Sequence, residues 1–196
     1  IFRFLWQNAW RTGQDTGRAA LHLMLNRMSQ GGIYDHLGGG YARYSTDANW
    51  LVPHFEKMLY DNAQILDLLA LAHADRAAPL YAARAEETVR WLVRDMSATP
   101  VDGPSAFAAS EDADSEGEEG RFYVWTEVEI DRLLGAQSAA FKVAYDVTPA
   151  GNWECHTILR RVTPPGAPAG RTTAGVCQPP RAKARIEKPR IEAITR

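Results

Sequence analysis

The residues best suited to chemistry are grouped between positions 54 and 61, in the run HFEKMLYD. If this run is helical, His54 lies beside Asp61 two turns on, and Glu56 lies beside Tyr60 one turn on. An imidazole near a carboxylate can move protons to and from carbon or oxygen near neutral pH. The same spacing suits an internal salt-bridge network, so the residues alone leave catalysis and a structural role as equal alternatives.

A second group of ionisable residues forms an acidic stretch. Its carboxylates are Glu111, Asp112, Asp114, Glu116, Glu118 and Glu119. Counted from Asp112, carboxylates at the first, third and fifth positions and Gly117 at the sixth resemble a calcium-binding EF-hand loop. Tyr123 occupies the twelfth position, where such a loop needs a bidentate glutamate, and this argues against calcium. The alternative is a solvated acidic turn at the tip of a hairpin.

We expect neither a metal nor a cofactor. The His-x-Glu pattern at His54 also occurs in zinc deaminases, but no Pro-Cys-x-x-Cys follows it. The only two cysteines, Cys155 and Cys177, are too far apart for a redox motif. The glycine-rich segment 31–40 follows a predicted helix and lacks the Lys-Ser/Thr ending of a phosphate loop. Its glycines predict tight turns at the rim of a cavity.

The elements that must position these residues are mainly helical. Apolar residues recur at helical spacing over 18–28, 53–73, 79–96, 126–135 and 138–145. Pro53 is expected in the first turn of the second helix, and Thr126 with Glu129 forms a capping box that begins the fourth. A strand is predicted over 121–125, paired with 105–110 across the acidic stretch.

The two ends of the chain differ from its middle. Residues 1–17 lack a clean period and predict a connecting segment, whereas 160–196 is a Pro-rich basic tail, expected to be disordered or translated out of frame. The 196 residues carry a formal net charge of -2 and no long apolar run, so we expect no nucleic-acid or membrane partner. The chain begins at Ile1 without an export signal, which indicates a piece of a longer, cytoplasmic protein.

Several motifs resemble one known family. They are the runs GGIYDHLGGG at 31–40, WLVPHFEKMLYDNA at 50–63, SEDADS at 110–115 and GRFYVW at 120–125. Together they resemble the spermatogenesis-associated, thioredoxin-domain-containing protein family, in the expected order over roughly residues 18–159.

The resemblance implies a fold class and a domain arrangement. Members of that family carry a thioredoxin-like domain followed by a toroid of six helical hairpins, the (α/α)6 type, similar to N-acylglucosamine 2-epimerases and several glycosidases. We therefore expect a mainly α fold in which residues 18–159 form a partial toroid with small β-hairpins in its loops. The thioredoxin-like domain is absent from this chain and is an expected partner of the toroid in the full-length protein.

The resemblance also implies a site, because sugars bind in the central pocket of related toroids. The catalytic candidates are His54, Glu56, Asp61, Asp112 and Asp114. The substrate-binding candidates are Arg43, Tyr44, Tyr60, Glu111, Trp125 and Trp153. The chemistry implied is acid/base work on a carbohydrate, either epimerisation or hydrolysis by paired carboxylates. The alternative is a non-catalytic scaffold or client-binding module that serves the missing redox domain.

Overall fold

The computed structural model describes residues 1–98 and 105–161, and most of the predicted tail lies outside these residues. Two helices open the chain: α1 (Phe2–Thr12) and α2 (Thr16–Gln30). The interpretation of residues 1–17 as an aperiodic connecting segment is wrong for α1, which buries Trp6 and Ala9. Gly13 ends this helix in a left-handed conformation, with φ at 71°. The glycines that follow α1 conceal its period when all 17 residues are read together.

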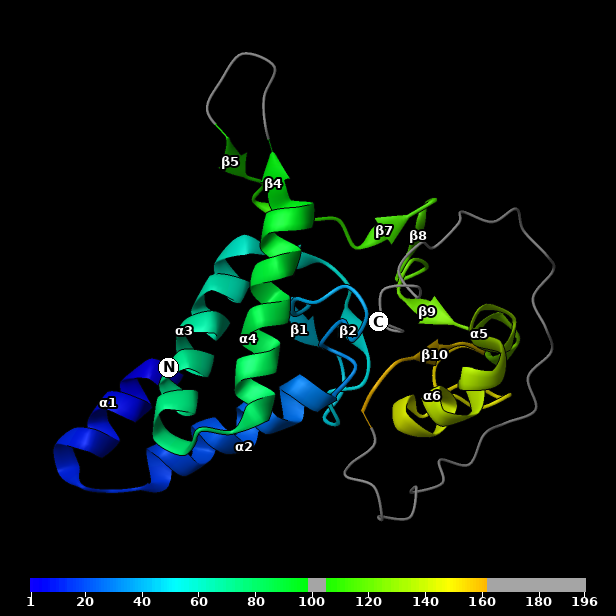
Figure 1. Ribbon diagram of the computed structural model, residues 1–196. Coiled ribbons are helices and arrows are strands. Elements are labelled where there is room, and N and C mark those ends of the chain that lie inside the picture. The colour runs from blue at the N-terminus through cyan, green and yellow to red at the C-terminus, as the bar shows by residue number, and fades with distance from the viewer. Residues whose placement is uncertain (99–104, 162–196) are drawn as a thin grey trace.

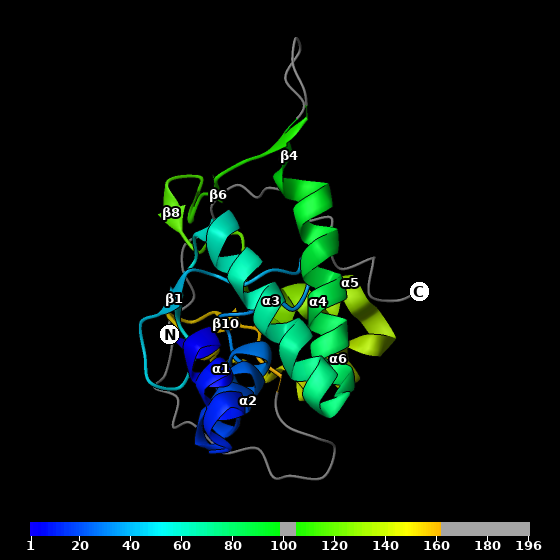
Figure 2. The same cartoon turned by 90° about the vertical axis from the view of Figure 1, so that its left-hand side faces the viewer.

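Two long helices pack against this pair. They are α3 (Leu59–Arg76) and α4 (Pro79–Trp91), and α4 continues into the π-helical turn η1 (Leu92–Met96). Figures 1 and 2 both show α3 and α4 side by side, with α2 across one end of the pair. Leu21 and Leu25 of α2, Leu69 and Ala72 of α3, and Tyr81 of α4 are buried in one core cluster. This apolar burial is the main stabilising force in the helical half.

The segment before α3 is extended, so the predicted helix start at Pro53 is wrong. Strand β1 (Tyr44–Ser45) pairs with β2 (Pro53–His54), and β3 (Lys57–Met58) pairs with β6 (Ser110–Glu111). These ladders satisfy backbone groups that a helix would otherwise use. The helix therefore begins six residues later than predicted, at Leu59.

The second half of the chain consists of short strand pairs and two short helices. The strands are β4 (Ser97–Ala98) with β5 (Ala106–Phe107), β7 (Asp114–Ser115) with β8 (Glu118–Glu119), and β9 (Val124–Trp125) with β10 (Thr157–Ile158). The helices are α5 (Glu127–Leu134) and α6 (Ser138–Tyr145), joined by the 3-10 turn η2 (Gly135–Gln137). The capping box of Thr126 and Glu129 is confirmed. The predicted pairing of 105–110 with 121–125 is wrong, because each segment pairs with a strand elsewhere.

The fold is mainly α, as predicted. About half of the described residues are helical, and the strands form separate two-stranded sheets. Figure 1 shows α1–α4 on one side and α5, α6, β9 and β10 on the other, with β1 and β2 between them. Within 1–98 and 105–161 we find no helix that is long and apolar enough to span a membrane.

The glycine-rich segment 31–40 lies against α4 at a distance that only glycine permits. Gly39 and Gly40 both have φ at 83°, in the left-handed region. A Cβ atom on Gly40 would lie 2.7 Å from a ring carbon of Trp91, and one on Gly39 would lie 2.5 Å from the carbonyl oxygen of Glu87. The close approach brings this segment to the base of the site described below.

This packing predicts the cost of a side chain at Gly40. We expect Gly40→Ala to lower the free energy of unfolding by about 2 to 4 kcal/mol, because backbone strain and overpacking against Trp91 add. Gly117→Ala is the matched control, because Gly117 also has positive φ but its added methyl group would meet no neighbouring atom within 4 Å. That change should cost about 1 to 2 kcal/mol, from backbone strain alone. Urea denaturation of both variants measures the difference, and equal losses would show that Trp91 yields to the methyl group.

Candidate functional site

The extended segment 53–58 separates two sets of side chains. Successive residues of a strand point to opposite faces, and here Pro53, Phe55 and Lys57 are buried whereas His54 and Glu56 are partly exposed. The partly exposed face carries what we call the outer cluster: Arg43, Tyr44, His54, Glu56 and Glu119. The buried face lines what we call the inner pocket. The residues of 54–57 that the sequence predicted on one helical surface are therefore divided between two faces of an extended segment.

His54 is the centre of the outer cluster. Its Nδ1 atom lies 2.7 Å from Oε1 of Glu119, and its Nε2 atom lies 3.5 Å from Oε2 of Glu56. The ring of Tyr44 stacks on the imidazole, with the ring centroids 5.1 Å apart. Because a carboxylate only accepts hydrogen bonds, the bond to Glu119 places a proton on Nδ1. Nε2 is then the nitrogen that is able to take up a proton beside Glu56.

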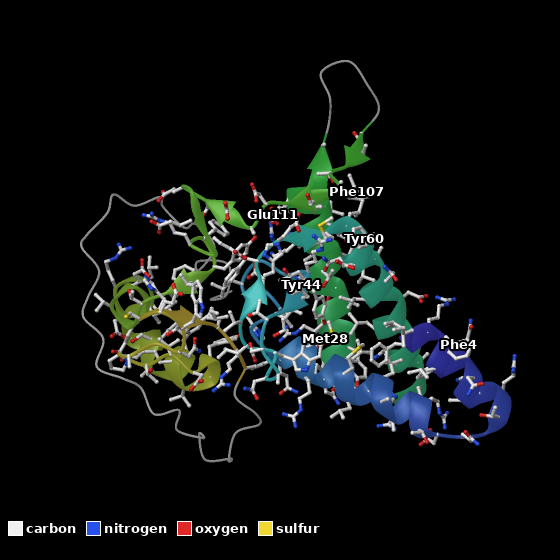
Figure 3. The ribbon with its side chains drawn as sticks, turned by 180° about the vertical axis from the view of Figure 1, so that it is seen from behind. Phe4, Met28, Tyr44, Tyr60, Phe107 and Glu111 are labelled. Carbon is white, nitrogen blue, oxygen red and sulfur yellow. The ribbon has the colours of Figure 1, made fainter. Side chains whose placement is uncertain are left out.

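Further charged and phenolic groups lie beside Arg43 and Glu56 of the outer cluster. Arg43 donates from Nη1 to Oε2 of Glu56 at 3.0 Å. Asp61 lies in the first turn of α3, where burial raises the pKa of its carboxyl, Glu56 raises that pKa further and Arg43 opposes the change. Tyr44 and Tyr60, both labelled in Figure 3, are about half exposed. The outer cluster is thus a shallow, water-accessible site with one imidazole and several carboxylates.

The acidic stretch reaches His54 through Glu119, which was not among the predicted site residues. Glu119, in β8, accepts hydrogen bonds from His54 and from the backbone N–H of Phe55. Asp112 instead accepts from the backbone N–H of Asp114 at 3.2 Å, and both side chains are exposed. Within the described part of the chain, the carboxylates that contact His54 are those of Glu119 and Glu56, not those of the two aspartates. The sequence carries no local signal for Glu119, because it lies 65 positions from His54.

Three predicted substrate-binding residues lie toward the inner side. Glu111 accepts a hydrogen bond from Nε1 of Trp91 at 2.8 Å and lies directly across the ladder from Lys57. Trp125 is only 3% exposed and lines the inner pocket. Trp153 packs against the ring of Phe55 in a core cluster. The structure thus brings Arg43, Tyr44 and Glu56 to His54. Glu111, Trp125 and Trp153 lie elsewhere.

The inner pocket is small and mostly aromatic. Its volume is about 40 Å³, which is room for two or three water molecules. Its lining includes Asp35, His36, Phe55, Lys57, Tyr123 and Trp125. A hexose ring is larger than this space, so the inner pocket as described does not hold one. The pocket combines apolar walls with a few polar groups, which is the usual composition of small-molecule sites.

Lys57 supplies the positive charge of the inner pocket, although its side chain is almost completely buried. Its Nζ atom donates to Oδ2 of Asp35 at 2.8 Å and to the carbonyl oxygen of Gly39 at 3.0 Å. The rings of Trp91 and Tyr123 lie 5.1 and 4.9 Å from the same atom, within the range of cation–π attraction. A buried charge is tolerated when it is paired in this way. The sequence alone assigns Lys57 no role in a site, because a helix over this run gives no indication that Asp35, 22 positions away, contacts the lysine.

A buried polar network supports the other end of the glycine-rich segment. Tyr34 donates to Oε2 of Glu87 at 2.6 Å, and the guanidinium of Arg84 lies 4.3 Å from the Tyr34 ring centroid. Burial raises the pKa of Tyr34 and of Tyr41 above the ordinary range, so both remain phenols. Arg84 also donates to the carbonyl oxygen of Ser29. These bonds hold the segment on α2 and α4.

His36 remains neutral in this network. Its Nε2 atom donates to the carbonyl oxygen of Gly31 at 3.0 Å, and its Nδ1 atom lies 3.4 Å from Nη2 of Arg84. Burial lowers the pKa of His36 to about 3, and the positive charge of Arg84 contributes to the same change. Within 1–98 and 105–161, no group of three or more His, Cys, Asp or Glu side chains is arranged to hold a metal ion.

Comparison with known proteins gives homologues for most of the chain. No family model matches it. It is 41% identical over 142 residues to spermatogenesis-associated protein 20 of Mus musculus and equally to that of Homo sapiens, with 68% of this chain and 17% of each relative covered. An uncharacterized protein of Caenorhabditis elegans is 35% identical over 139 residues, covering 65% of this chain and 18% of that protein. The chain therefore has homologues named spermatogenesis-associated protein 20, and it spans less than a fifth of their length.

The lowered pKa of His36 predicts a pH dependence of stability. The folded state disfavours the charged imidazole. The contribution of neutral His36 to the free energy of unfolding is therefore complete above the ordinary pKa of 6.5 and is lost as pH falls toward 3. We expect the free energy of unfolding to fall by roughly 3 kcal/mol from this residue between pH 7 and pH 4. Urea denaturation at both pH values, compared with His36→Gln, isolates the effect. An unchanged pH dependence in the variant would contradict it.

The buried ion pair predicts a second stability effect. We expect Lys57→Met to cost about 3 to 5 kcal/mol, because it leaves the Asp35 carboxylate buried without its cation. Adding Asp35→Asn should recover part of this loss, since the amide oxygen can still accept from the backbone N–H groups of Leu37 and Gly38. Arg90→Met is the control: its pair with Glu86 is exposed and should cost less than about 1 kcal/mol. Equal losses in Lys57→Met and the control would show that burial adds nothing to the pair.

Proposed function

We propose that the outer cluster is an acid/base site that acts on a carbohydrate, of the epimerase or glycosidase type. The observation that carries this proposal is the environment of His54. Glu119 binds its Nδ1 atom at 2.7 Å, while Nε2 lies near Glu56 on a partly exposed surface. A carboxylate that fixes one imidazole nitrogen and leaves the other for proton transfer is a recurrent arrangement in enzymes.

The residues of the outer cluster and two neighbouring residues of α3, Tyr60 and Asp61, take distinct roles in this proposal. Nε2 of His54 accepts a proton from the substrate, and the carboxylate of Glu119 stabilises the imidazolium that forms. Asp61 retains a proton to higher pH than an ordinary carboxyl group, which suits a proton donor. Tyr44 and Tyr60 offer exposed ring faces on which the apolar side of a sugar can pack.

The carbohydrate assignment is supported by the motif resemblance and by the mainly α fold. Both are associational, since one fold serves many reactions. The proton-transfer chemistry rests on the geometry of His54 alone and applies to any substrate with a removable proton.

A second candidate is a scaffold that binds a partner, with a thioredoxin-like domain of the full-length protein as the expected partner. The observation that favours it is the exposed apolar surface of α1, where Phe4 is 67% and Trp10 is 64% exposed. Trp10 also lines a groove together with Trp6 and Leu71. Large exposed aromatic side chains of this kind often mark interaction surfaces.

A titration with sugars tests the first candidate. We expect one member of a panel of free and N-acylated monosaccharides to bind the chain, measured by calorimetry and by shifts of the His54 ring signals in NMR spectra. His54→Gln should weaken binding about tenfold or more, because a hydrogen bond to a charged group contributes roughly 1.5 to 3 kcal/mol. His73→Gln, at the end of α3, is the control and should bind as the unchanged chain does.

Two results would count against the acid/base proposal. One is the absence of binding by every sugar at concentrations where the chain is folded. The other is equal binding by the unchanged chain and by His54→Gln. If substitution of Trp10 abolishes binding of a purified thioredoxin-like domain while His54→Gln has no effect, the scaffold candidate is favoured.

A further inference from the structure

The inner pocket has one polar end and otherwise apolar walls, and the outer cluster does not use it. Lys57 is 1% exposed, and it lines the pocket together with its partner Asp35. The rings of Phe55, Tyr123 and Trp125 form part of the remaining wall. The backbone of residues 53–58 separates this space from His54 and Glu56. Any ligand of the pocket is therefore distinct from a ligand of the outer cluster.

The ammonium group of Lys57 has one more donor than the described residues satisfy. It carries three N–H bonds, of which two are directed to Asp35 and Gly39. The next carboxylate oxygen, Oε2 of Glu111, lies 4.0 Å away, too far for a hydrogen bond, and already accepts from Trp91. A buried donor without an acceptor is unfavourable, so the third N–H favours an acceptor atom in the adjoining pocket.

The charges around the pocket select a neutral acceptor. Lys57 and Asp35 offset each other, burial keeps His36 neutral, and Glu111 adds a nearby negative charge. An anionic ligand would bring an uncompensated charge into this apolar space, and a cation would meet the ammonium group. An uncharged oxygen both accepts the third N–H of Lys57 and adds no charge to the pocket.

We propose that the inner pocket is a binding site for a small neutral carbonyl compound. The carbonyl oxygen accepts the third N–H of Lys57, and the apolar part of the ligand contacts the rings of Phe55, Tyr123 and Trp125. The volume of about 40 Å³ admits a group of a few heavy atoms, which is either a whole small molecule or the end of a larger one. Binding needs no reaction at Lys57, whose ammonium group also contacts Asp35 and two aromatic rings.

Acetamide and acetate are matched probes for this proposal, because they have the same number of heavy atoms and differ in charge. We expect acetamide to shift the backbone amide signals of the pocket residues Ile33, Leu37 and Ile158 saturably in ¹H–¹⁵N NMR spectra of the full chain at neutral pH. Acetate should bind at least tenfold more weakly at those residues. Equal or tighter binding of acetate would overturn the proposal, as would the absence of pocket shifts with both probes.

Substitution of the ion pair provides a second measurement. The double variant Lys57→Met with Asp35→Asn removes the donor without leaving a buried charge, and it should bind acetamide at least tenfold more weakly than the unchanged chain. Lys142→Met is the control, since Lys142 pairs with Glu127 and Asp131 on α5. Undiminished acetamide binding by a folded double variant would overturn the proposal. If the double variant does not fold, the comparison of acetamide with acetate decides alone.

Discussion

The buried ammonium group of Lys57 contacts three segments of this protein that are distant in the sequence. It contacts the glycine-rich segment through Asp35 and Gly39, α4 through the ring of Trp91, and the second half through Tyr123. Because a buried charge is stable only with its partners in place, these segments hold one another in position. His54 and Glu56 are neighbours of Lys57 on the same short strand segment, so the geometry of the outer cluster depends on a contact made on the opposite face.

Most of the helices could be predicted from the sequence, because their apolar residues repeat at the helical period. This holds for α2, α4, α5 and α6, and the side-chain cap of α5 was evident from Thr126 and Glu129. Residues 53–58 could not be assigned in the same way. Phe55 and Leu59 fit the period of α3, but β1 and β6 supply ladder bonds from outside the segment. Such pairing is decided by the tertiary fold, and local spacing does not report it.

The candidate site could be predicted only in part, because some of its contacts join residues that are distant in the sequence. Arg43, Tyr44 and Glu56 lie near His54 in the sequence, and the β1–β2 pairing brings them together. Glu119 and Asp35 make their contacts with the 53–58 segment from 65 and 22 positions away. A single sequence gives no measure of such distances. Charge identity alone therefore could not distinguish Glu119 from the other acidic residues of its stretch.

The alternation of side chains along 53–58 makes the length of this segment as important as its composition. Loss of Pro53, or gain of one residue between Pro53 and His54, would shift the strand register and turn the side chains of 54–58 to the opposite face. Lysine would then stand in water, while imidazole and carboxylate would replace it among aromatic rings. The odd and even positions of 53–58 thus form two chemically different surfaces. One inserted or deleted residue at the start of the segment would exchange them, whereas a point substitution would alter only one.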